Sequence, residues 1–488
     1  PPRSTLFPYT TLFRLHIEDG VNRDSTRFSA ALTWDFGNWA LVSQSGLFST
    51  DIQYGYDSTY QGGTVLGPTT IPGSNPVANR AATDPVRVRS TLRNEVSARD
   101  EWSSELRVET RGEGRTRFMA GVFYYDSDRS LEERHFDASA PAIFFGETRV
   151  ENWAVFGSAG VDLTDRWEAT AELRYAEDTI GNFNNVSPLR VNEPLIERTF
   201  DSVSPRVTTS FKVTPNNMLY LNVAQGNKPG VINADPRFPP EIRFAEEETS
   251  WNYEIGTKNT LFGGRMVANL ALYYIDWDDQ QLTSTFTFPT GGTQSFLRNA
   301  GKSEVRGAEL EITGNITDNF TAGLTYALAD TEIKEMSDVE ANELFESPSV
   351  AGRQLPGVPQ NTASIFGRVE FPIRDQMNAF VRADASYVDE KFDQIYNLAS
   401  TGEQTLVNMT IGLETGHWNL SLFVKNLTDD RTPSSLTRYV DQMNLNVAAA
   451  PNPNPAQVNV TGTTATERAF WWGMPPRRQV GLNATYRF

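Results

Sequence analysis

One stretch of the sequence decides the fold: Trp167-Glu168-Ala169-Thr170-Ala171-Glu172-Leu173-Arg174-Tyr175. Every second residue is apolar, and the residues between them are polar or charged. Successive side chains of an extended strand point to opposite faces, whereas an amphipathic helix repeats every three to four residues. The stretch therefore predicts a β-strand with one apolar face and one polar face.

The same alternation recurs along the chain, for example in residues 218–224, 418–425 and 480–488. Segmentation on this pattern predicts about 17 strands. Their expected bounds are 27–36, 39–53, 97–110, 115–133, 148–163, 167–179, 198–212, 216–226, 248–261, 265–278, 297–315, 318–333, 359–372, 376–390, 404–414, 417–426 and 477–488.

The connections between these strands alternate in length. Short turns are expected at 37–38, 112–114, 164–165, 215–216, 263–264, 317–318, 374–375 and 415–416. Long stretches separate them, at 54–96, 134–147, 180–197, 227–247, 279–296, 334–358, 391–403 and 427–476. An outer-membrane barrel has tight periplasmic turns and long extracellular loops, so its connections alternate in length. A soluble sandwich has no reason to keep every other loop short. The pattern predicts an all-β fold, a transmembrane antiparallel β-barrel.

Residue types support this fold. Aromatic residues gather near the expected strand ends, as in the two interfacial girdles of a barrel: Trp34, Trp39, Tyr124, Tyr125, Trp153, Trp251, Tyr273, Tyr274, Trp277, Trp418 and Tyr486. The expected lumen-facing positions are polar or charged: Glu168, Glu172, Arg174, Arg382, Asp384 and Lys425. An apolar face toward lipid and a polar face toward an enclosed space account for both sets.

Composition narrows the function. The formal net charge of -18 argues against a nucleic-acid partner, because phosphate binding needs a surplus of Lys and Arg. Cysteine is absent, which removes disulfides, thiolate nucleophiles and Cys-built zinc sites. His16, His135 and His417 are too scattered to form a recognisable ligand cluster. No nucleophile elbow or phosphate-binding loop is present, so we expect no enzyme activity, no cofactor and no metal site.

The first residues differ in character from the rest. Residues 1–14, PPRSTLFPYTTLFR, lack the basic start, apolar core and cleavage site of a signal peptide. We expect them to be a non-native leader and residues 15–488 to form the barrel part.

Several local strings, taken together and in order, resemble those of TonB-dependent outer-membrane receptor barrels. They are Glu105-Leu106-Arg107, Gly121-Val122-Phe123-Tyr124-Tyr125, Ser204-Pro205-Arg206-Val207, Gln225-Gly226-Asn227-Lys228-Pro229-Gly230, Glu254-Ile255-Gly256-Thr257-Lys258, Leu272-Tyr273-Tyr274-Ile275-Asp276-Trp277, Arg306-Gly307-Ala308-Glu309-Leu310-Glu311, Pro356-Gly357-Val358-Pro359-Gln360, Val424-Lys425-Asn426-Leu427-Thr428-Asp429 and Pro476-Arg477-Arg478. Asn227 departs from the pattern, because the family usually has an aromatic residue there.

The resemblance implies a plugged barrel of about 22 strands. On that basis the chain is expected to be truncated: about 17 of these strands, without the plug domain or the TonB box. The end of the chain resembles the signal that outer-membrane assembly machinery recognises, with Val480, Leu482, Ala484, Tyr486 and Phe488 at alternate positions.

The resemblance also implies a function and a location: TonB-energised uptake of a scarce ligand, a ferric siderophore first of all, through the outer membrane of a Gram-negative bacterium. The expected partners are outer-membrane lipid, the TonB complex through the missing plug and TonB box, the assembly machinery, and the siderophore or another small ligand. Candidate ligand contacts are aromatic and arginine residues of the long loops: Tyr396, Arg438, Tyr439, Trp471 and Trp472. For any one of them, loop packing is the simpler interpretation.

Two other classes of protein stay open. A passive porin or an outer-membrane adhesin would share the barrel but have no plug or TonB box. A soluble secreted β-protein would bury the apolar strand faces in a dry centre between stacked sheets.

Overall fold

The computed structural model describes residues 20–57, 65–66, 87–88, 92–112, 114–136, 142–185, 195–235, 237–287, 293–299, 301–440 and 468–487. The proposed leader, residues 1–14, lies outside this set. The strands are β1 (Gly20–Phe36), β2 (Trp39–Asp57), β3 (Val65–Leu66), β4 (Arg87–Val88), β5 (Leu92–Thr110), β6 (Thr116–Phe136), β7 (Ala142–Thr164), β8 (Trp167–Asn185), β9 (Ile196–Thr214), β10 (Asn217–Lys228), β11 (Val231–Ile232), β12 (Phe244–Ala245), β13 (Glu248–Leu261), β14 (Met266–Asp278), β15 (Gln281–Thr287), β16 (Thr293–Asn299), β17 (Lys302–Asn315), β18 (Phe320–Glu335), β19 (Asn361–Arg374), β20 (Met377–Val388), β21 (Gln404–Thr415), β22 (Trp418–Lys425), β23 (Ser435–Val440), β24 (Arg468–Gly473) and β25 (Gln479–Tyr486). The helical elements are η1 (Pro240–Ile242), η2 (Phe262–Gly264) and α3 (Val339–Phe345).

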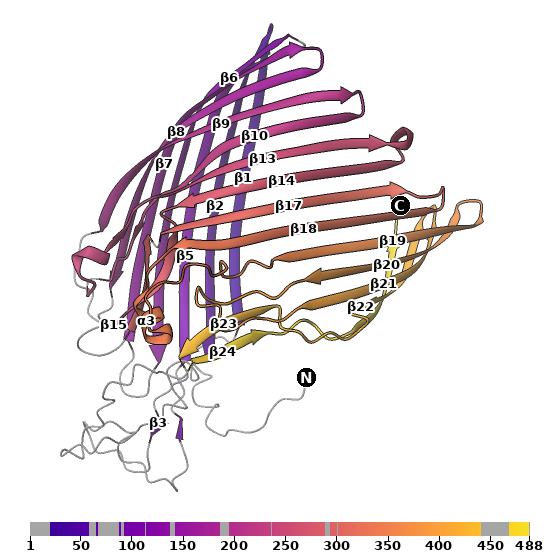
Figure 1. The fold of residues 1–488 in the computed structure, drawn as a ribbon. Coiled ribbons are helices and arrows are strands. Elements are labelled where there is room, and N and C mark those ends of the chain that lie inside the picture. Colours follow the sequence, from indigo (N-terminus) through magenta and orange to yellow (C-terminus); the bar gives the residue numbers. More distant parts are fainter. Residues whose placement is uncertain are drawn as a thin grey trace, which may run out of the picture.

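A single antiparallel sheet of 17 strands forms the body of the molecule, as the sequence predicts. Its spatial order is β1-β2-β5-β6-β7-β8-β9-β10-β13-β14-β17-β18-β19-β20-β21-β22-β25, so each strand pairs with its neighbours along the chain. Figure 1 shows the sheet curving round, with β1, β2 and β5 behind β17 and β18. No ladder joins β1 to β25 among the described residues.

Strand ends at the short turns agree with the sequence to within a few residues, but from β1 to β10 the opposite ends of the sheet strands run further than expected. β6 and β7 take up most of the expected loop 134–147, and β8 continues to Asn185. The expected strand 297–315 is wrong as one element, because β16 ends at Asn299 and β17 starts at Lys302. Beyond the apolar part of the sheet both faces meet water, so strands continue there without the alternation that identifies them.

One face of the sheet, here called the outer face, carries a continuous apolar band. Leu106, Val122 and Val155 are register partners on β5, β6 and β7, and their exposed fractions are 45%, 50% and 44%. The band runs on through Leu221, Ile255, Leu272, Ile365, Ile411, Leu422 and Leu482, all exposed. Soluble monomers rarely expose apolar patches beyond a few hundred Å². This face is therefore suited to hydrocarbon.

The other face, here called the inner face, is charged, and many of its charges are paired. Arg107 lies between Glu105 and Glu109, with nitrogen–oxygen distances of 2.5 and 3.0 Å. Arg368 contacts Glu370 at 2.8 Å and Glu414 at 3.2 Å. The expected lumen-facing positions Glu168, Glu172, Arg174, Arg382, Asp384 and Lys425 alternate with outer-face residues on the same strands. The other sheets in the described part have two strands each, so no second large sheet stacks on this one there, as a sandwich would require.

Aromatic rings on the inner face lie against glycines of the next strand. The six direct register pairs are Phe156–Gly121, Tyr220–Gly256, Tyr273–Gly307, Phe366–Gly323, Phe380–Gly412 and Phe423–Gly481. A Cβ atom at these glycines would lie 2.0–2.6 Å from the nearest ring atom, so no larger residue fits without movement. Several glycines in the family-like strings are therefore explained by packing.

The aromatic girdles are present on the outer face, but some of the residues expected in them lie on the inner face. Trp102 and Tyr124 contact at 5.2 Å between ring centroids, and Trp153 and Tyr175 at 5.5 Å. At the short-turn end, Trp34 packs on Phe36 and Trp418 on Tyr486. Tyr125, Tyr273 and Trp277 are not girdle residues: they lie on the inner face, because Tyr124 and Tyr274 face outward and successive residues of a strand alternate between the two faces.

Candidate ligand-recognition site

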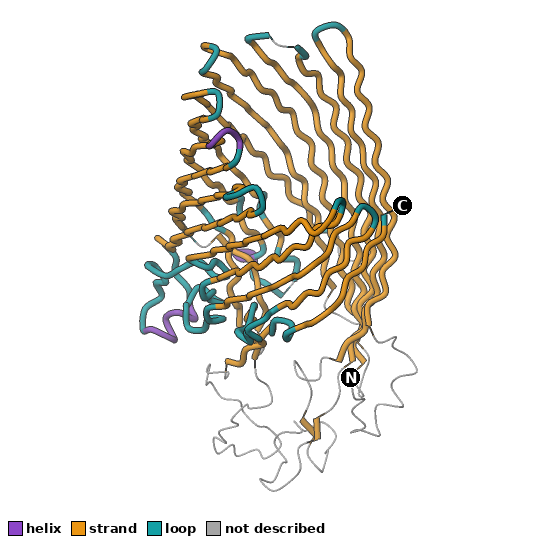
Figure 2. The backbone as a smooth tube through the Cα atoms, turned by 90° about the vertical axis from the view of Figure 1, so that its right-hand side faces the viewer, coloured by secondary structure: helices purple, strands orange, loops and turns teal. Residues whose placement is uncertain are grey.

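The long loops gather at one end of the sheet and the short turns at the other, as Figures 1 and 2 show. Four of these loops, residues 229–247, 279–301, 336–360 and 389–403, contact one another and are here called the loop assembly. β15 and β16 form a hairpin within it, and α3 lies in the loop that follows β18. These contacts make the loops at this end of the molecule one connected structure.

Asp338 joins three of the loops. Its carboxylate accepts hydrogen bonds from Tyr396 Oη at 2.7 Å and Ser284 Oγ at 3.1 Å, and Arg298 Nη2 contacts it at 3.2 Å. The backbone N–H of Ala341 lies 3.4 Å from its Oδ1, at the start of α3. Asp338 is 6% exposed, and a buried carboxylate must be paired and hydrogen-bonded in this way.

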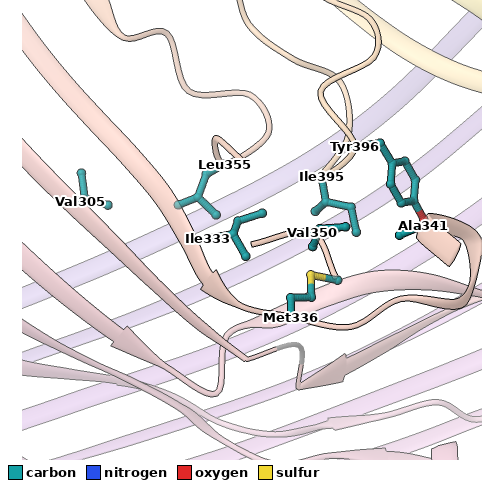
Figure 3. Packing of buried hydrophobic residues seen from close by; sticks show 8 residues of the cluster. All are labelled: Val305, Ile333, Met336, Ala341, Val350, Leu355, Ile395 and Tyr396. Carbon is teal, nitrogen blue, oxygen red and sulfur yellow. The ribbon is translucent and has the colours of Figure 1, made fainter. Parts of the chain in front are cut away.

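Figure 3 shows an apolar cluster that includes Tyr396, the hydrogen-bond partner of Asp338. Its buried members are Val305, Ile333, Met336, Ala341, Val350, Leu355, Ile395 and Tyr396. Val305 and Ile333 come from β17 and β18, whereas the others come from the loops. The cluster seats the loops on the inner face, against Tyr273 and Ile275.

Backbone contacts hold the loop before β21 against the loop before β19. Arg353 Nη1 donates to the carbonyl of Tyr396 at 2.7 Å, and the Arg353 guanidinium lies 4.0 Å from the ring centroid of Phe345. Asn397 accepts from the N–H of Gln354 at 2.7 Å and donates to its carbonyl at 3.0 Å. Because both loops are tied at several points, they form one structural unit.

The amide side chain of Asn233 helps to fix the loop before β13. Asn233 Nδ2 donates to the carbonyls of Ile242 and Leu297, and its Oδ1 accepts from the N–H of Leu297. Nearby, burial disfavours the charged form of Asp235, but hydrogen bonds from Arg237 prevail and lower the pKa of Asp235. Asp235 therefore stays ionised as part of this loop.

The family-like strings at 424–429 and 476–478 meet in space. Asn426, with a φ of 50°, donates to the carbonyls of Asp430 and Pro476 at 3.0 Å each. The backbone N–H of Arg478 donates to Asp429 at 2.9 Å, and this bond, with the Arg431 side chain, lowers the pKa of Asp429. These strings close the base of the last loop.

The structure places the predicted ligand contacts in two locations. Tyr396 is 4% exposed and packs within the loop assembly, so it presents no surface for direct contact in this state. The other four lie in the hairpin of β23 and β24, where Arg438 pairs in register with Phe470 and Thr437 with Trp471. Trp472 is 53% exposed. Ligand contact by these residues stays a prediction.

The final strand, β25, pairs with β22. Val480, Leu482, Ala484 and Tyr486 pair in register with Val424, Leu422, Leu420 and Trp418. These residues form one apolar face, as the proposed assembly signal requires, while Phe488 lies outside the described residues. Recognition of this strand stays a prediction.

Sequence reasoning missed the residues that organise the loops, above all Asp338, Arg298 and Asn233. They lie in segments where apolar and polar residues do not alternate. Only a sequence motif that marks buried hydrogen-bond networks could have identified them. Within the described ranges, no group of three or more His, Asp or Glu side chains could hold a metal ion. Across the same residues, no helix has the length and hydropathy needed to cross a membrane.

Comparisons with known proteins agree on one family. The pesticin receptor of Yersinia enterocolitica is 25% identical over 334 residues, which are 67% of this chain and 46% of that receptor. The metal-pseudopaline receptor CntO of Pseudomonas aeruginosa is 24% identical over 236 residues, 47% of this chain and 30% of that receptor. The chain thus spans less than half the length of these relatives in the matched regions.

Solved structures share the fold. The ferric yersiniabactin uptake receptor FyuA from Yersinia pestis superposes with a TM-score of 0.70 at 18% identity, covering 97% of this chain and 63% of that one. The siderophore receptor PiuA from Acinetobacter baumannii gives a TM-score of 0.66 at 14% identity, covering 95% and 64%. The model of the TonB dependent receptor-like β-barrel matches residues 2–427, and the chain belongs to that family.

Proposed function

We propose that the chain acts in the outer membrane of a Gram-negative bacterium as the barrel of a receptor for TonB-energised uptake of a ferric siderophore. The observation that carries this proposal is the two-faced sheet: an exposed apolar band on one side and a charged, loop-covered face on the other. The relatives are receptors, which supports transport rather than catalysis.

The ligand class is taken from the relatives. Their names refer to metal-pseudopaline in CntO, to a siderophore in PiuA and to ferric yersiniabactin in FyuA. A siderophore supplies its own iron ligands, which is compatible with a described part that contains no metal-binding cluster. The proposed partners are lipid on the outer face, the TonB complex through a plug domain and TonB box, and the assembly machinery at β25.

Uptake under iron limitation tests the proposal. The gene that encodes this chain, with any segments that flank it, is expressed in a receptor-null strain, and growth is measured on a panel of single ferric chelates. We expect rescue by at least one chelate and loss of rescue when TonB is deleted. Rescue that persists without TonB would support a passive porin, and no rescue by any chelate would refute the transport function.

Membrane location is tested separately. Outer-membrane fractionation should recover the chain only with detergent, because the apolar band needs a hydrocarbon solvent. Recovery in the aqueous fraction would contradict the assignment of the outer face to lipid.

A further inference from the structure

Four arginines gather on the inner face of β1, β5 and β6. Arg23 and Arg27 belong to β1, Arg99 to β5 and Arg129 to β6. Arg99 and Arg129 are direct register partners, and Arg99 also pairs with Thr50 on β2. These four residues, all exposed, are here called the arginine patch.

Contacts confirm that the patch lies on one face. Arg23 Nε donates to Ser25 Oγ at 3.0 Å, and Ser25 hydrogen-bonds Thr50 at 2.8 Å, next to Arg99. Arg27 lies 5.1 Å from the ring centroid of Phe48 on β2. Further hydroxyl contacts to the patch arginines come from Ser97, Tyr125 and Ser127.

Within the described residues, the patch is neutralised only in part. Its one carboxylate partner there is Glu101, which contacts Arg99 at 2.5 Å, whereas Arg23, Arg27 and Arg129 form no ion pair with another described residue. Elsewhere on this face, Arg107, Arg117 and Arg368 each contact two carboxylates. Like charges directly opposite in a ladder are destabilising, and Glu101 offsets only one of the two charges of the Arg99–Arg129 pair.

The alternation of the strands separates the charges. At the same level of the sheet, the opposite face carries Asp24, Asp51, Asp100 and Asp128. The patch is therefore a locally basic surface in a chain whose formal net charge is -18.

The patch lies outside the membrane, on the side of the long loops. Arg99 precedes the girdle residue Trp102 by three positions on β5, which corresponds to about 10 Å along the strand. A ligand that passes the loops would therefore meet the patch before it reaches the level of the lipid. Guanidinium groups bind carboxylate and phosphate oxygens in a bidentate manner and keep their charge at any accessible pH.

We propose that the arginine patch binds the anionic, oxygen-rich part of the transported chelate, so that the receptor selects ligands that carry free carboxylates or similar oxyanions. The inference rests on the transport function proposed above and adds the charge class of its ligand.

Binding of two chelates to the purified chain in detergent micelles tests the inference. The probes are ferric citrate, which is anionic, and ferrioxamine B, which carries no free carboxylate. The double variant Arg99→Gln/Arg129→Gln should bind ferric citrate at least tenfold more weakly, which corresponds to about 1.4 kcal/mol. Wild-type affinity for ferric citrate should fall as salt concentration rises and should exceed that for ferrioxamine B.

The matched control is Arg115→Gln/Arg149→Gln, which changes net charge equally. Arg115 contacts Asp165 in a short turn and Arg149 contacts Asp128 on the outer face. Equal loss in both double variants, or unchanged affinity in the patch variant, would overturn the inference. If uptake stays TonB-dependent and the patch variant binds ferric citrate normally, the ligand-binding role of the patch is refuted but the transport function is not. If the wild-type chain shows neither binding nor uptake, the transport function is refuted as well. Circular dichroism and heat-modifiable gel mobility confirm that each variant is folded.

Discussion

Replacing Gly307 by alanine tests the aromatic–glycine packing of the inner face. A Cβ atom at Gly307 would lie 2.0 Å from Tyr273 Cζ and 2.3 Å from its hydroxyl oxygen. The ring must retreat by about 1.4 Å to restore a contact of 3.4 Å, and Tyr273 is also packed against the apolar cluster of the loops. Overpacking of this kind costs about 1–3 kcal/mol. We expect the free energy of unfolding of Gly307→Ala to fall by that amount.

The assay is equilibrium urea unfolding in lipid vesicles, followed by tryptophan fluorescence. Gly146→Ala on β7 is the matched control, because the nearest atoms to its Cβ lie at 3.7 Å and the residue is on the same face. Alanine there should be neutral or stabilise by about 0.5–1 kcal/mol. The double variant Gly307→Ala/Tyr273→Ala should lose less than the sum of the two single variants, since the clash needs both side chains. Equal stability of Gly307→Ala and wild type, or strict additivity, would refute the packing argument.

Three further predictions concern lipid contact, the loops and pH. Ile365→Arg on the outer face of β19 should lower the free energy of unfolding in vesicles by about 2–4 kcal/mol, whereas Ser364→Arg on the inner face should change it far less; equal effects would contradict the lipid assignment. Asp338→Asn removes the ion pair with Arg298, so hydrogen exchange in residues 336–360 should become roughly ten- to a hundredfold faster, while Asp318→Asn in an exposed turn leaves it unchanged. The lowered pKa of Asp429 means that its stabilising contribution is complete above the ordinary value of 3.8 and is lost as pH falls through the lower folded value. The melting temperatures of wild type and Asp429→Asn should therefore converge in acid and differ above about pH 4, and a constant difference would contradict the assignment.

The strand content was predictable because lipid imposes a strict rule. A membrane strand must present apolar side chains at every second position, and residues 167–175 have this alternation throughout. The alternation fixes both strand number and face, so all 17 strands of the sheet lie where the sequence places them, apart from their outer ends. Adjacent tyrosines such as Tyr124 and Tyr125 are separated by the same rule, since only one of the two can face lipid.

The loops were not predictable in the same way. Ser284 lies 54 residues before Asp338 in the sequence, and Tyr396 lies 58 residues after it. The three side chains nevertheless form one hydrogen-bonded group. Hydrogen bonds of this kind depend on which loops meet, and loops outside lipid carry no periodic signal. Tyr396 illustrates the difference: its aromatic character suggested a recognition surface, and the fold buries it.

The sequence by itself determined the strand pattern, the order of short and long connections and the family-like strings. The tertiary structure alone decided which distant side chains meet: the carboxylate of Asp338 with three loops, the rings of one strand on the glycines of the next, and four arginines of β1, β5 and β6 on one wall. The physical reason is range. Alternation is a property of neighbouring residues, whereas burial, charge pairing and close packing depend on register between strands that lie tens of residues apart in the chain.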